Sequence, residues 1–334
     1  MSIFVTGAAG YIGGTFAFEA LKRGYKVIGC DNYINSKPNT IQKIKKLFPE
    51  NFVFYEIDLK NIDDLKKVIK KENISQVVHF AALKSVPESE EFPEKYWKNN
   101  VDSTENLLNV MRQNNIKELI FSSSASVYGQ TKEQPITEQN KLDPLSVYAK
   151  TKAASENLIK EISLKGDLKA ISLRYFNPLG AHSDLVVYEN PMTEFGNVMP
   201  KLLRVFLKID DNFSIFGDDY DTRDGTGERD YLHISDLIEG HFLALSYLKN
   251  ISNYDVFNLG TGEGITVLEL LSAFEEVSGS NIKKKIKDKR LGDVDVCYSD
   301  PSKSNKILGW NTRKSLFDMC NDSIQAIKRN IDEL

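Results

Sequence analysis

Tyr148 and Lys152 are the two residues whose types and spacing most directly suggest chemistry. They lie four residues apart at the start of a predicted helix over residues 148–164, so their side chains share one helix face. A tyrosine with a pKa of about 10 is a poor base at neutral pH. A nearby ammonium group and the positive end of a helix both favour the phenolate. The pair therefore predicts a general acid/base, although a plain surface pair would show the same spacing.

A run of serines and small residues at positions 122–129 follows a predicted strand over residues 118–123. In a parallel sheet this position is the carboxyl edge, where ligands bind. A serine there can hydrogen-bond both a substrate hydroxyl and the tyrosine, and we assign that role to Ser124 in preference to Ser126. An ordinary polar turn would use the same residue types.

Three glycines, Gly7, Gly10 and Gly13, follow the first predicted strand and open the first predicted helix. Glycine suits a turn with unusual backbone angles, and it lets a pyrophosphate approach the main chain and the free amides of the helix N-terminus. The next predicted strand ends at Asp31, where an acidic residue accepts hydrogen bonds from both ribose hydroxyls of a dinucleotide. A carboxylate at this position repels the 2′-phosphate of NADP, so the pattern predicts NAD.

Asp58 stands at the end of the third predicted strand. Its carboxylate can accept a hydrogen bond from the adenine amino group. It can equally serve as the N-cap of the helix that begins near Asn61.

Short apolar strands alternate with amphipathic helices, which predicts an α/β fold of the Rossmann type, a doubly wound parallel sheet. The predicted strands are residues 3–6, 26–31, 52–58, 76–81, 118–123 and 170–176, and the predicted helices are residues 12–23, 61–71, 101–113 and 148–164. After residue 176 the chain has long polar stretches at residues 181–197 and 218–227, further helices at residues 235–248 and 267–277, and a strand at 256–259. We therefore expect an NAD-binding domain over residues 1–176, to which segments near residues 229–260 return, and a smaller C-terminal α/β substrate domain over residues 177–334.

The composition excludes several classes of protein. The 334 residues include 43 Lys and Arg and 47 Asp and Glu, a net charge of −4, which is a poor match to nucleic acid. Three scattered cysteines form neither a disulfide framework nor a zinc site, and no metal site is expected. No apolar run reaches the ~18 residues of a membrane span, and the N-terminus does not have the pattern of a signal peptide. We expect a cytoplasmic protein without membrane or nucleic-acid partners.

Motifs along nearly the whole chain resemble the extended short-chain dehydrogenase/reductase superfamily and, more narrowly, its UDP-glucose 4-epimerase (UDP-galactose 4-epimerase) family. These motifs are GAAGYIG at residues 7–13, DN at 31–32, HFAALK at 79–84, SSSASVYG at 122–129, YAKTK at 148–152, RYFNPLGAH at 174–182, DGTGERDYLH at 224–233, FNLGTG at 257–262 and R-x-G-D at 290–293.

The resemblance implies two sets of binding residues besides the catalytic Tyr148, Lys152 and Ser124. The implied NAD contacts are Gly7, Gly10, Tyr11, Ile12, Gly13, Asp31, Asn32, Asp58, Leu59, Phe80, Ala81, Ala82, Lys84, Asn99, Tyr148, Lys152 and Tyr175. The implied UDP-sugar contacts are Ser124, Asn177, Asn197, Val198, Phe216, Arg229, Arg290, Asp293 and Cys297. Guanidinium groups suit a diphosphate ester, which carries two negative charges.

By the same resemblance, the expected activity is reversible 4-epimerisation of UDP-hexoses through a transient 4-keto sugar, with enzyme-bound NAD, in carbohydrate metabolism such as that of galactose. A small residue at Cys297 implies a hexose pocket that also admits the N-acetyl sugars UDP-N-acetylglucosamine and UDP-N-acetylgalactosamine. Alternatively, Cys297 is a buried small residue and Tyr298 fills the pocket. The resemblance also implies a homodimer formed through the helices at residues 101–113 and 148–164.

Proteins with three other functions share parts of these motifs. A nucleotide-sugar 4,6-dehydratase is disfavoured, because Ala125 and Ser126 stand where that enzyme class carries an Asp-Glu pair. A UDP-glucuronate 4-epimerase would share nearly every catalytic part. A non-catalytic NAD-binding regulatory protein on the same fold is the third alternative, and such proteins tend to lose the tyrosine or the lysine that this chain keeps.

Overall fold

The computed structural model describes residues 1–190, 197–290 and 293–333. Their contacts divide the chain into two compact units. Unit 1 comprises Met1–Gly129, Lys141–Arg174 and Gly240–Phe257, and unit 2 comprises Gln130–Asn140, Tyr175–Glu239 and Asn258–Leu334. The chain first passes to unit 2 at residues 130–140, which were expected in the NAD-binding domain. The assignment of NAD and substrate binding to the two parts stays a prediction.

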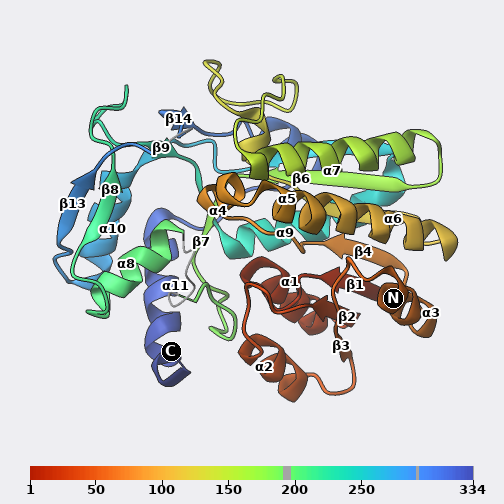
Figure 1. Ribbon diagram of the computed structural model, residues 1–334. Helices are drawn as coiled ribbons and strands as arrows, with labels where there is room; N and C mark the ends of the chain where they lie inside the picture. Colours follow the sequence, from red (N-terminus) through yellow and green to blue (C-terminus); the bar gives the residue numbers. More distant parts are fainter. Residues whose placement is uncertain (191–196, 291–292, 334) are drawn as a thin grey trace. The chain divides into compact units, whose positions relative to one another are not determined.

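A seven-stranded sheet forms the centre of unit 1 (Figure 1). The strands lie in the order β11-β6-β5-β4-β1-β2-β3, and β1 to β6 pair in parallel. Their bounds are β1 Ser2–Thr6, β2 Lys26–Asp31, β3 Phe52–Glu56, β4 Gln76–His79, β5 Glu118–Ser122, β6 Lys169–Tyr175 and β11 Tyr254–Leu259. The strand order reverses between β1 and β4, which is the switch point where ligands of such sheets bind. The predicted Rossmann-type fold class is confirmed.

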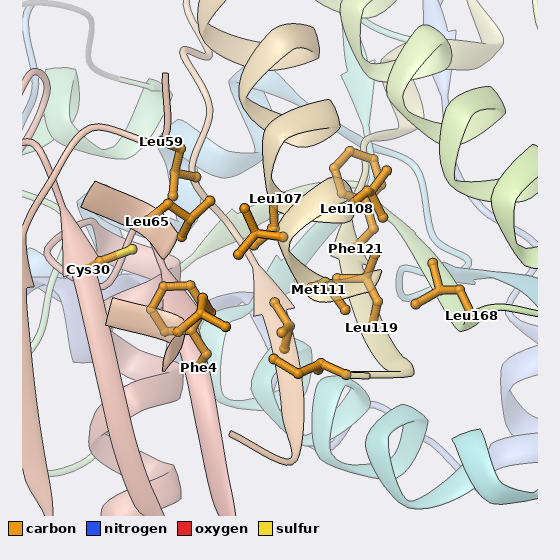
Figure 2. Packing of buried hydrophobic residues seen from close by; sticks show 14 of the residues in the cluster. Phe4, Cys30, Leu59, Leu65, Leu107, Leu108, Met111, Leu119, Phe121 and Leu168 are labelled. Carbon is orange, nitrogen blue, oxygen red and sulfur yellow. The ribbon is translucent and has the colours of Figure 1, made fainter. Parts of the chain in front are cut away.

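Helices cover both faces of this sheet. They are α1 Tyr11–Lys22, α2 Asn39–Leu47, α3 Ile62–Lys71, α4 Val86–Glu91, α5 Pro93–Tyr96, α6 Ser103–Gln113, α7 Val147–Leu164 and α9 Ile234–Tyr247, with short η1 Trp97–Asp102, η2 Ala125–Tyr128 and η3 Leu248–Asn250. On one face, leucines and Met111 of α3 and α6 pack against Phe4 and Phe121 of the strands (Figure 2). On the other face, Phe16 of α1 stacks on Phe242 of α9 at 4.7 Å between ring centroids. Burial on both faces explains why the strands read as nearly continuous apolar runs.

Unit 2 has its own apolar core and three small sheets. The helices are α8 Val198–Phe206, α10 Val267–Ser278 and α11 Leu316–Arg329, with short η4 Ser304–Leu308 and η5 Ile331–Glu333. The paired strands are β7 Asn177–Leu179 with β10 Tyr231–His233, β8 Phe213–Phe216 with β13 Lys284–Lys287, and β9 Glu228–Arg229 between β12 Ile265–Thr266 and β14 Val296–Cys297. In the part of the chain that the structure describes, no helix is long and apolar enough to span a membrane.

Several helices differ from the sequence-based expectation. The helix expected from residue 101 begins as α6 at Ser103, because the preceding residues Trp97–Asp102 form a π-helix. Helices α2, α8 and α11 were not predicted, and neither were the short helices α4 and α5. Helix α2 is short, buries only Ile41 and Ile44, and has no capping side chain at its N-cap position, Pro38. Helix α11 is amphipathic and begins with a capping box of Ser315 and Asp318, a signal that the sequence analysis overlooked.

Candidate active site

The glycine turn is packed backbone against backbone. Gly7 has φ of +70°, and a Cβ there would lie 2.8 Å from the backbone nitrogen of Ala81. A Cβ on Gly13 would overlap the carbonyl oxygen of Gly7. Gly10 is the N-cap of α1 and has no side chain with which to cap the helix. Because Gly10 has no side chain, it does not cap the first backbone amides of α1. Free amides next to a tight main-chain turn are a suitable environment for a pyrophosphate.

Asp31 ends β2 beside this turn. Its carboxylate accepts hydrogen bonds from the backbone nitrogens of Ala9 at 3.0 Å and Tyr33 at 2.8 Å and from the Ser36 hydroxyl at 3.0 Å. Burial raises the pKa of Asp31, and these hydrogen bonds oppose that rise. The carboxylate thus helps to shape the glycine turn.

Asp58 does not cap α3, which corrects the alternative weighed for it. The N-cap is Asn61, whose side chain accepts hydrogen bonds from the backbone nitrogens of Asp63 and Asp64. The Asp58 carboxylate accepts instead from the Asn32 side chain at 3.1 Å and from the backbone nitrogen of Lys60 at 2.9 Å.

Buried polar groups join the segment after β4 to the end of β1, the strand that precedes the glycine turn. The backbone nitrogen of Ala81 donates to the Thr6 hydroxyl at 3.2 Å, and that hydroxyl lies 2.7 Å from Nδ1 of His79. Burial, with a smaller contribution from the Lys152 ammonium group, lowers the pKa of His79 to about 3, so its imidazole is neutral. His79 therefore has a structural role in the segment that contains several of the implied NAD contacts.

The π-helix η1 contains two neighbouring asparagines, Asn99 and Asn100, whose side chains make buried hydrogen bonds. Asn99, an implied NAD contact, is buried and donates to the side chain of Asn100 at 3.2 Å. Asn100 in turn bonds both backbone groups of Leu83 and the Thr151 hydroxyl of α7. The segment after β4 and the start of α7 are thereby held to the same helix.

Helix α7 presents the Tyr–Lys pair. Ser146 is the N-cap and accepts from the backbone nitrogen of Ala149 at 3.1 Å. Tyr148, in the first turn, is half-buried. The Lys152 side chain is 3% exposed, and its Nζ donates to the backbone oxygen of Ser122 at the end of β5, at 2.7 Å. Burial lowers the pKa of Lys152 to about 7, although Glu156 acts in the opposite direction. The lysine is therefore poised near neutral pH.

Ser124 lies two residues beyond the carbonyl that Lys152 contacts. Its hydroxyl is 2.9 Å from that of Ser126 and accepts from the Ser126 backbone nitrogen at 3.2 Å, which caps η2. Because β1 to β5 are parallel, the ends of all five strands lie along one edge of the sheet. The candidate residues at those strand ends, or in the segments that directly follow them, are Gly7, Gly10, Tyr11, Ile12, Gly13, Asp31, Asn32, Asp58, Leu59, Phe80, Ala81, Ala82, Lys84 and Ser124.

In unit 2 the implied UDP-sugar residues fall into two groups. Phe216 ends β8, and the guanidinium carbon of Arg290 lies 3.9 Å from its ring centroid. Arg229, on β9, forms an ion pair with Asp293, which also accepts from the Tyr220 hydroxyl at 3.3 Å. Cys297, on β14, is the strand partner of Arg229, and burial raises the pKa of its thiol to about 11.

Four further candidate residues belong to unit 2. Asn177 begins β7, and both its backbone nitrogen and its side chain donate to the backbone oxygen of Asp230, at 2.9 and 3.1 Å. Asn197 is the N-cap position of α8 and donates to Glu189 at 2.7 Å, and Val198 is the first residue of that helix. Tyr175 ends β6 and is half-buried.

Asp230 is an organising residue that sequence reasoning missed. Its carboxylate is fully buried and accepts from the backbone nitrogens of Thr261, Gly262 and Ser299 and from the hydroxyls of Thr261 and Ser299, at 2.7–3.1 Å. Two recognised motifs, at residues 224–233 and 257–262, meet at this carboxylate. Their joint presence was the available signal.

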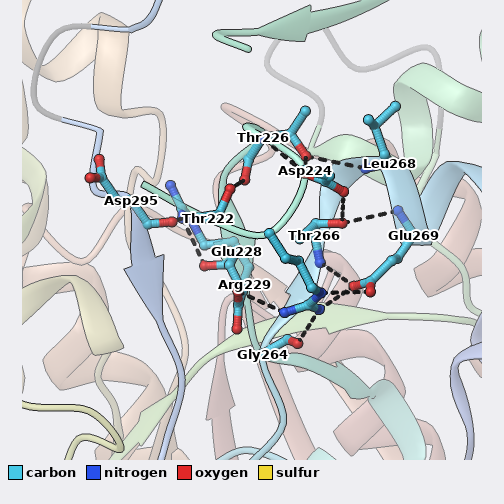
Figure 3. A network of polar contacts seen from close by, with 11 residues as sticks. Thr222, Asp224, Thr226, Glu228, Arg229, Gly264, Thr266, Leu268, Glu269 and Asp295 are labelled. Atoms are coloured by element: carbon cyan, nitrogen blue, oxygen red, sulfur yellow. Dashed lines mark hydrogen bonds and ion pairs between the residues drawn. The ribbon is translucent and has the colours of Figure 1, made fainter. Parts of the chain in front are cut away.

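A second polar network supports strand β9, which carries Arg229 (Figure 3). Arg223 donates to Glu228 at 2.8 Å, to the backbone oxygen of Gly264 at 2.8 Å and to Glu269 of α10. Arg229 donates to the backbone oxygens of Glu228 and Asp295, at 2.8 and 3.2 Å. The arginine that is expected to meet a diphosphate is therefore fixed in its strand.

The histidines have structural partners. Nδ1 of His233 accepts from the backbone nitrogen of Ser235 at 3.0 Å, and its Nε2 lies 3.2 Å from Asp322 of α11. Nδ1 of His182 accepts from the backbone nitrogen of Asp184 at 3.2 Å. Within residues 1–190, 197–290 and 293–333, no group of three or more His, Cys, Asp or Glu side chains is arranged to hold a metal ion.

Comparison with known proteins agrees with this geometry. Residues 3–260 match the family described as the NAD dependent epimerase/dehydratase family. The chain is 39% identical over 333 residues to the UDP-glucose 4-epimerase of Bacillus subtilis, covering 99% of this chain and 98% of that protein.

Solved structures are similarly close. A UDP-glucose 4-epimerase from Stenotrophomonas maltophila, with bound NAD and formylated UDP-arabinopyranose, superposes with a TM-score of 0.95 at 36% identity, and all of both chains is covered. The enzyme from Bifidobacterium longum in complex with NAD+ and UDP gives 0.94 at 38% identity, again over all of both chains. With its glycine turn, Asp31 and the Tyr148–Lys152 pair in place, this chain belongs to the UDP-glucose 4-epimerases of the NAD dependent epimerase/dehydratase family.

Proposed function

We propose that this chain is a cytoplasmic, homodimeric enzyme that interconverts UDP-glucose and UDP-galactose, and the corresponding N-acetyl sugars, by epimerisation at carbon 4. The observation that carries the proposal is the position of Lys152. Its Nζ donates to the backbone oxygen of Ser122 at the end of β5, two residues before Ser124, and Tyr148 lies one turn earlier on the same helix. The proposed base Tyr148, the Lys152 cation and the Ser124 hydroxyl therefore belong to the same edge of the sheet as the glycine turn.

The proton chemistry belongs to α7. Tyr148 takes the proton from the 4-hydroxyl of the sugar and later returns it. The Lys152 ammonium group and the N-terminal end of α7 stabilise the phenolate form, and the Ser124 hydroxyl orients the sugar hydroxyl. The glycine turn and Asp31 would hold NAD, which would supply the acceptor and the donor of the hydride at carbon 4.

Epimerisation requires that the nucleotide be held firmly and the hexose loosely, because the 4-keto sugar must turn about its link to the diphosphate. Arg229 and Arg290 supply guanidinium groups for the diphosphate, and Phe216 supplies a face for the uracil ring. Binding energy from the nucleotide retains an intermediate that the hexose pocket hardly grips.

The test is product analysis by NMR after incubation of the purified protein with UDP-galactose and, separately, with UDP-N-acetylgalactosamine. We expect UDP-glucose from the first and UDP-N-acetylglucosamine from the second. UDP-glucuronate is the comparison substrate. If only the uronate reacts, the chain is a uronate epimerase. If the protein carries NAD but converts no UDP-sugar, it is a regulatory protein, and the proposal is wrong.

Cys297 supports the extension to N-acetyl sugars. Its strand partner is Arg229, and Asp293 is also close enough to influence its thiol. Tyr298, the next residue, instead lines a surface hollow of unit 2 together with Arg223 and Leu316. Tyr298 directly follows β14, and consecutive residues of an extended chain point to opposite sides. The small thiol therefore shares the side of the substrate-binding arginine, and the tyrosine does not.

Replacing Cys297 by tyrosine is expected to lower kcat/KM for UDP-N-acetylgalactosamine by about tenfold or more, because the larger side chain takes the room of the N-acetyl group. Activity with UDP-galactose should change by no more than about threefold. The matched control is Tyr298→Phe, which should change neither activity. A Cys297→Tyr variant that keeps full activity on both sugars would refute the role of Cys297 as the size gate.

The proposed homodimer uses α6 and α7, which pack against each other in unit 1 (Figure 1). Apolar side chains are exposed near them, including Trp97 of η1 at 41% and Leu164 of α7 at 61%. Sedimentation should give about twice the chain mass of 37.8 kDa at micromolar concentration. A mass of one chain at that concentration would contradict the dimer.

The proposed cytoplasmic location is supported by the cysteines. All three are free thiols, as is usual for proteins of a reducing compartment.

A further inference from the structure

A buried ion pair lies behind the serine segment of unit 1. Arg174 of β6 donates to both carboxylate oxygens of Glu156 of α7, from Nε at 3.0 and 3.2 Å and from Nη2 at 2.6 Å. The two residues are 5% and 2% exposed. Taking two charges out of water is costly, and an apolar pair of similar size is often as stable or more so. Stability alone is therefore a weak reason for this pair.

The ion pair holds both ends of one short segment. At the first end, the Ser123 hydroxyl donates to Oε1 of Glu156. At the other end, Nη1 of Arg174 donates to the Tyr128 hydroxyl at 3.0 Å, and the guanidinium carbon lies 5.0 Å from the centroid of that ring. Residues 124–127, which include Ser124, lie between these two anchors.

Two successive turns of helix α7 contact the end of β5, where this segment begins. Lys152 donates to the backbone oxygen of Ser122, and Glu156, four residues later, accepts from the hydroxyl of Ser123. Tyr148 lies one turn before Lys152 on the same helix. Two adjacent residues at the end of β5 are thus joined to two adjacent turns of the helix that carries the proposed base.

We propose that Glu156 and Arg174 are positioning residues of the reaction, which fix the Ser123–Tyr128 segment, and with it the Ser124 hydroxyl, relative to Tyr148 and Lys152. The inference rests on the proposed 4-epimerase function. The pair itself does not touch substrate. It acts through Ser123 and Tyr128, whose hydroxyl groups are its only links to the segment among the hydrogen bonds described for residues 1–190, 197–290 and 293–333.

Two small substitutions remove these links without breaking the ion pair. Ser123→Ala deletes the hydroxyl that reaches Glu156, and Tyr128→Phe deletes the hydroxyl that reaches Arg174 while keeping the ring. Because a misplacement of about 1 Å in a reacting group can cost about 10²-fold in rate, we expect each variant to lower kcat for UDP-galactose by about tenfold to a hundredfold. The dissociation constant for UDP should stay within about twofold, since the nucleotide is held by other residues.

The controls separate positioning from loss of stability. Ser163→Ala removes an equally buried serine hydroxyl of α7, which donates to the backbone oxygen of Ile159 at 2.8 Å. Tyr96→Phe removes an equally buried tyrosine hydroxyl, which donates to Glu88 at 2.8 Å. Each test variant should match its control in Tm and still lose kcat. Ser123→Thr, which restores a hydroxyl, should recover most of the activity.

The result that would overturn the inference is a kcat within about twofold of the controls for both Ser123→Ala and Tyr128→Phe. Equal losses in the test variants and in the controls would overturn it too, since they would indicate a general effect on the fold. The unsubstituted protein is assayed first in the same experiment. If it converts no UDP-sugar, the proposed function has failed, a result distinct from a failure of the positioning pair.

Discussion

Replacing Tyr148 by phenylalanine is expected to lower kcat for UDP-galactose by about 10²–10⁴-fold, because the variant has no group at that position to take the proton of the 4-hydroxyl. The ring remains, so the packing of the first turn of α7 is kept. The cap of that turn is the Ser146 side chain, and the backbone nitrogen of Tyr148 donates to Ser89 at 3.1 Å. Neither hydrogen bond uses the phenolic hydroxyl.

The measurement is product formation by NMR, together with the NAD content of the purified variant and its dissociation constant for UDP. NAD content and UDP affinity should be those of the unsubstituted protein, since only the proton-transfer group is lost. Tyr25→Phe is the matched control, because Tyr25 lies outside the motifs and precedes the amino end of β2, opposite the end that carries Asp31. Turnover within about tenfold of the unsubstituted protein would exclude Tyr148 as the base.

Replacing Lys152 by methionine is expected to change both activity and the pH dependence of stability. Burial lowers the pKa of Lys152 in the folded protein to about 7, from an ordinary value of 10.5. Between these two values the unfolded chain binds more protons than the folded protein. The free energy of unfolding therefore rises with pH over this window, and the contribution is complete only above the unfolded value. Each unit of pKa corresponds to about 1.4 kcal/mol, so the total is several kcal/mol.

The Lys152→Met variant lacks this contribution. We expect its free energy of unfolding in urea to exceed that of the unsubstituted protein near pH 7 and to lose that advantage as the pH approaches 10. Turnover should fall by about 10²-fold or more, since the phenolate loses its cation. Lys160→Met, at an exposed position of the same helix, is the control and should alter neither the slope nor turnover. Parallel stability curves for Lys152→Met and the unsubstituted protein would contradict the buried, perturbed lysine.

The strands of unit 1 were largely predictable because each is buried on both faces. Strand β2 has the predicted bounds, and β1, β4 and β5 begin or end within two residues of them. A buried parallel strand must be apolar at nearly every position, so the first and last residues of the apolar run indicate where the strand begins and ends. Helix α2 was missed because it is short and Pro38, at its N-cap position, supplies no capping side chain to mark its start.

The candidate site also has parts that the sequence predicted and parts that it did not. The glycine turn and the Tyr148–Lys152 spacing depend on neighbours within one or two turns of chain, and a sequence pattern can express them. Asp230 was missed because its partners, Thr261, Gly262 and Ser299, are 31 to 69 residues away. Satisfying a buried carboxylate needs several donors from separate segments, and no short pattern specifies them.

The sequence by itself determined which groups are present for chemistry and how they are spaced along the chain: the phenol, the amine one turn later, the glycines and the carboxylate of Asp31. Only the tertiary structure decided their environment. It buried the Lys152 ammonium group against the backbone oxygen of Ser122, which moves its pKa toward neutrality, and it placed Glu156 and Arg174 behind the serine segment. Proton affinity depends on solvent exclusion and on charges brought together from distant parts of the chain, and these exist only once the chain has folded.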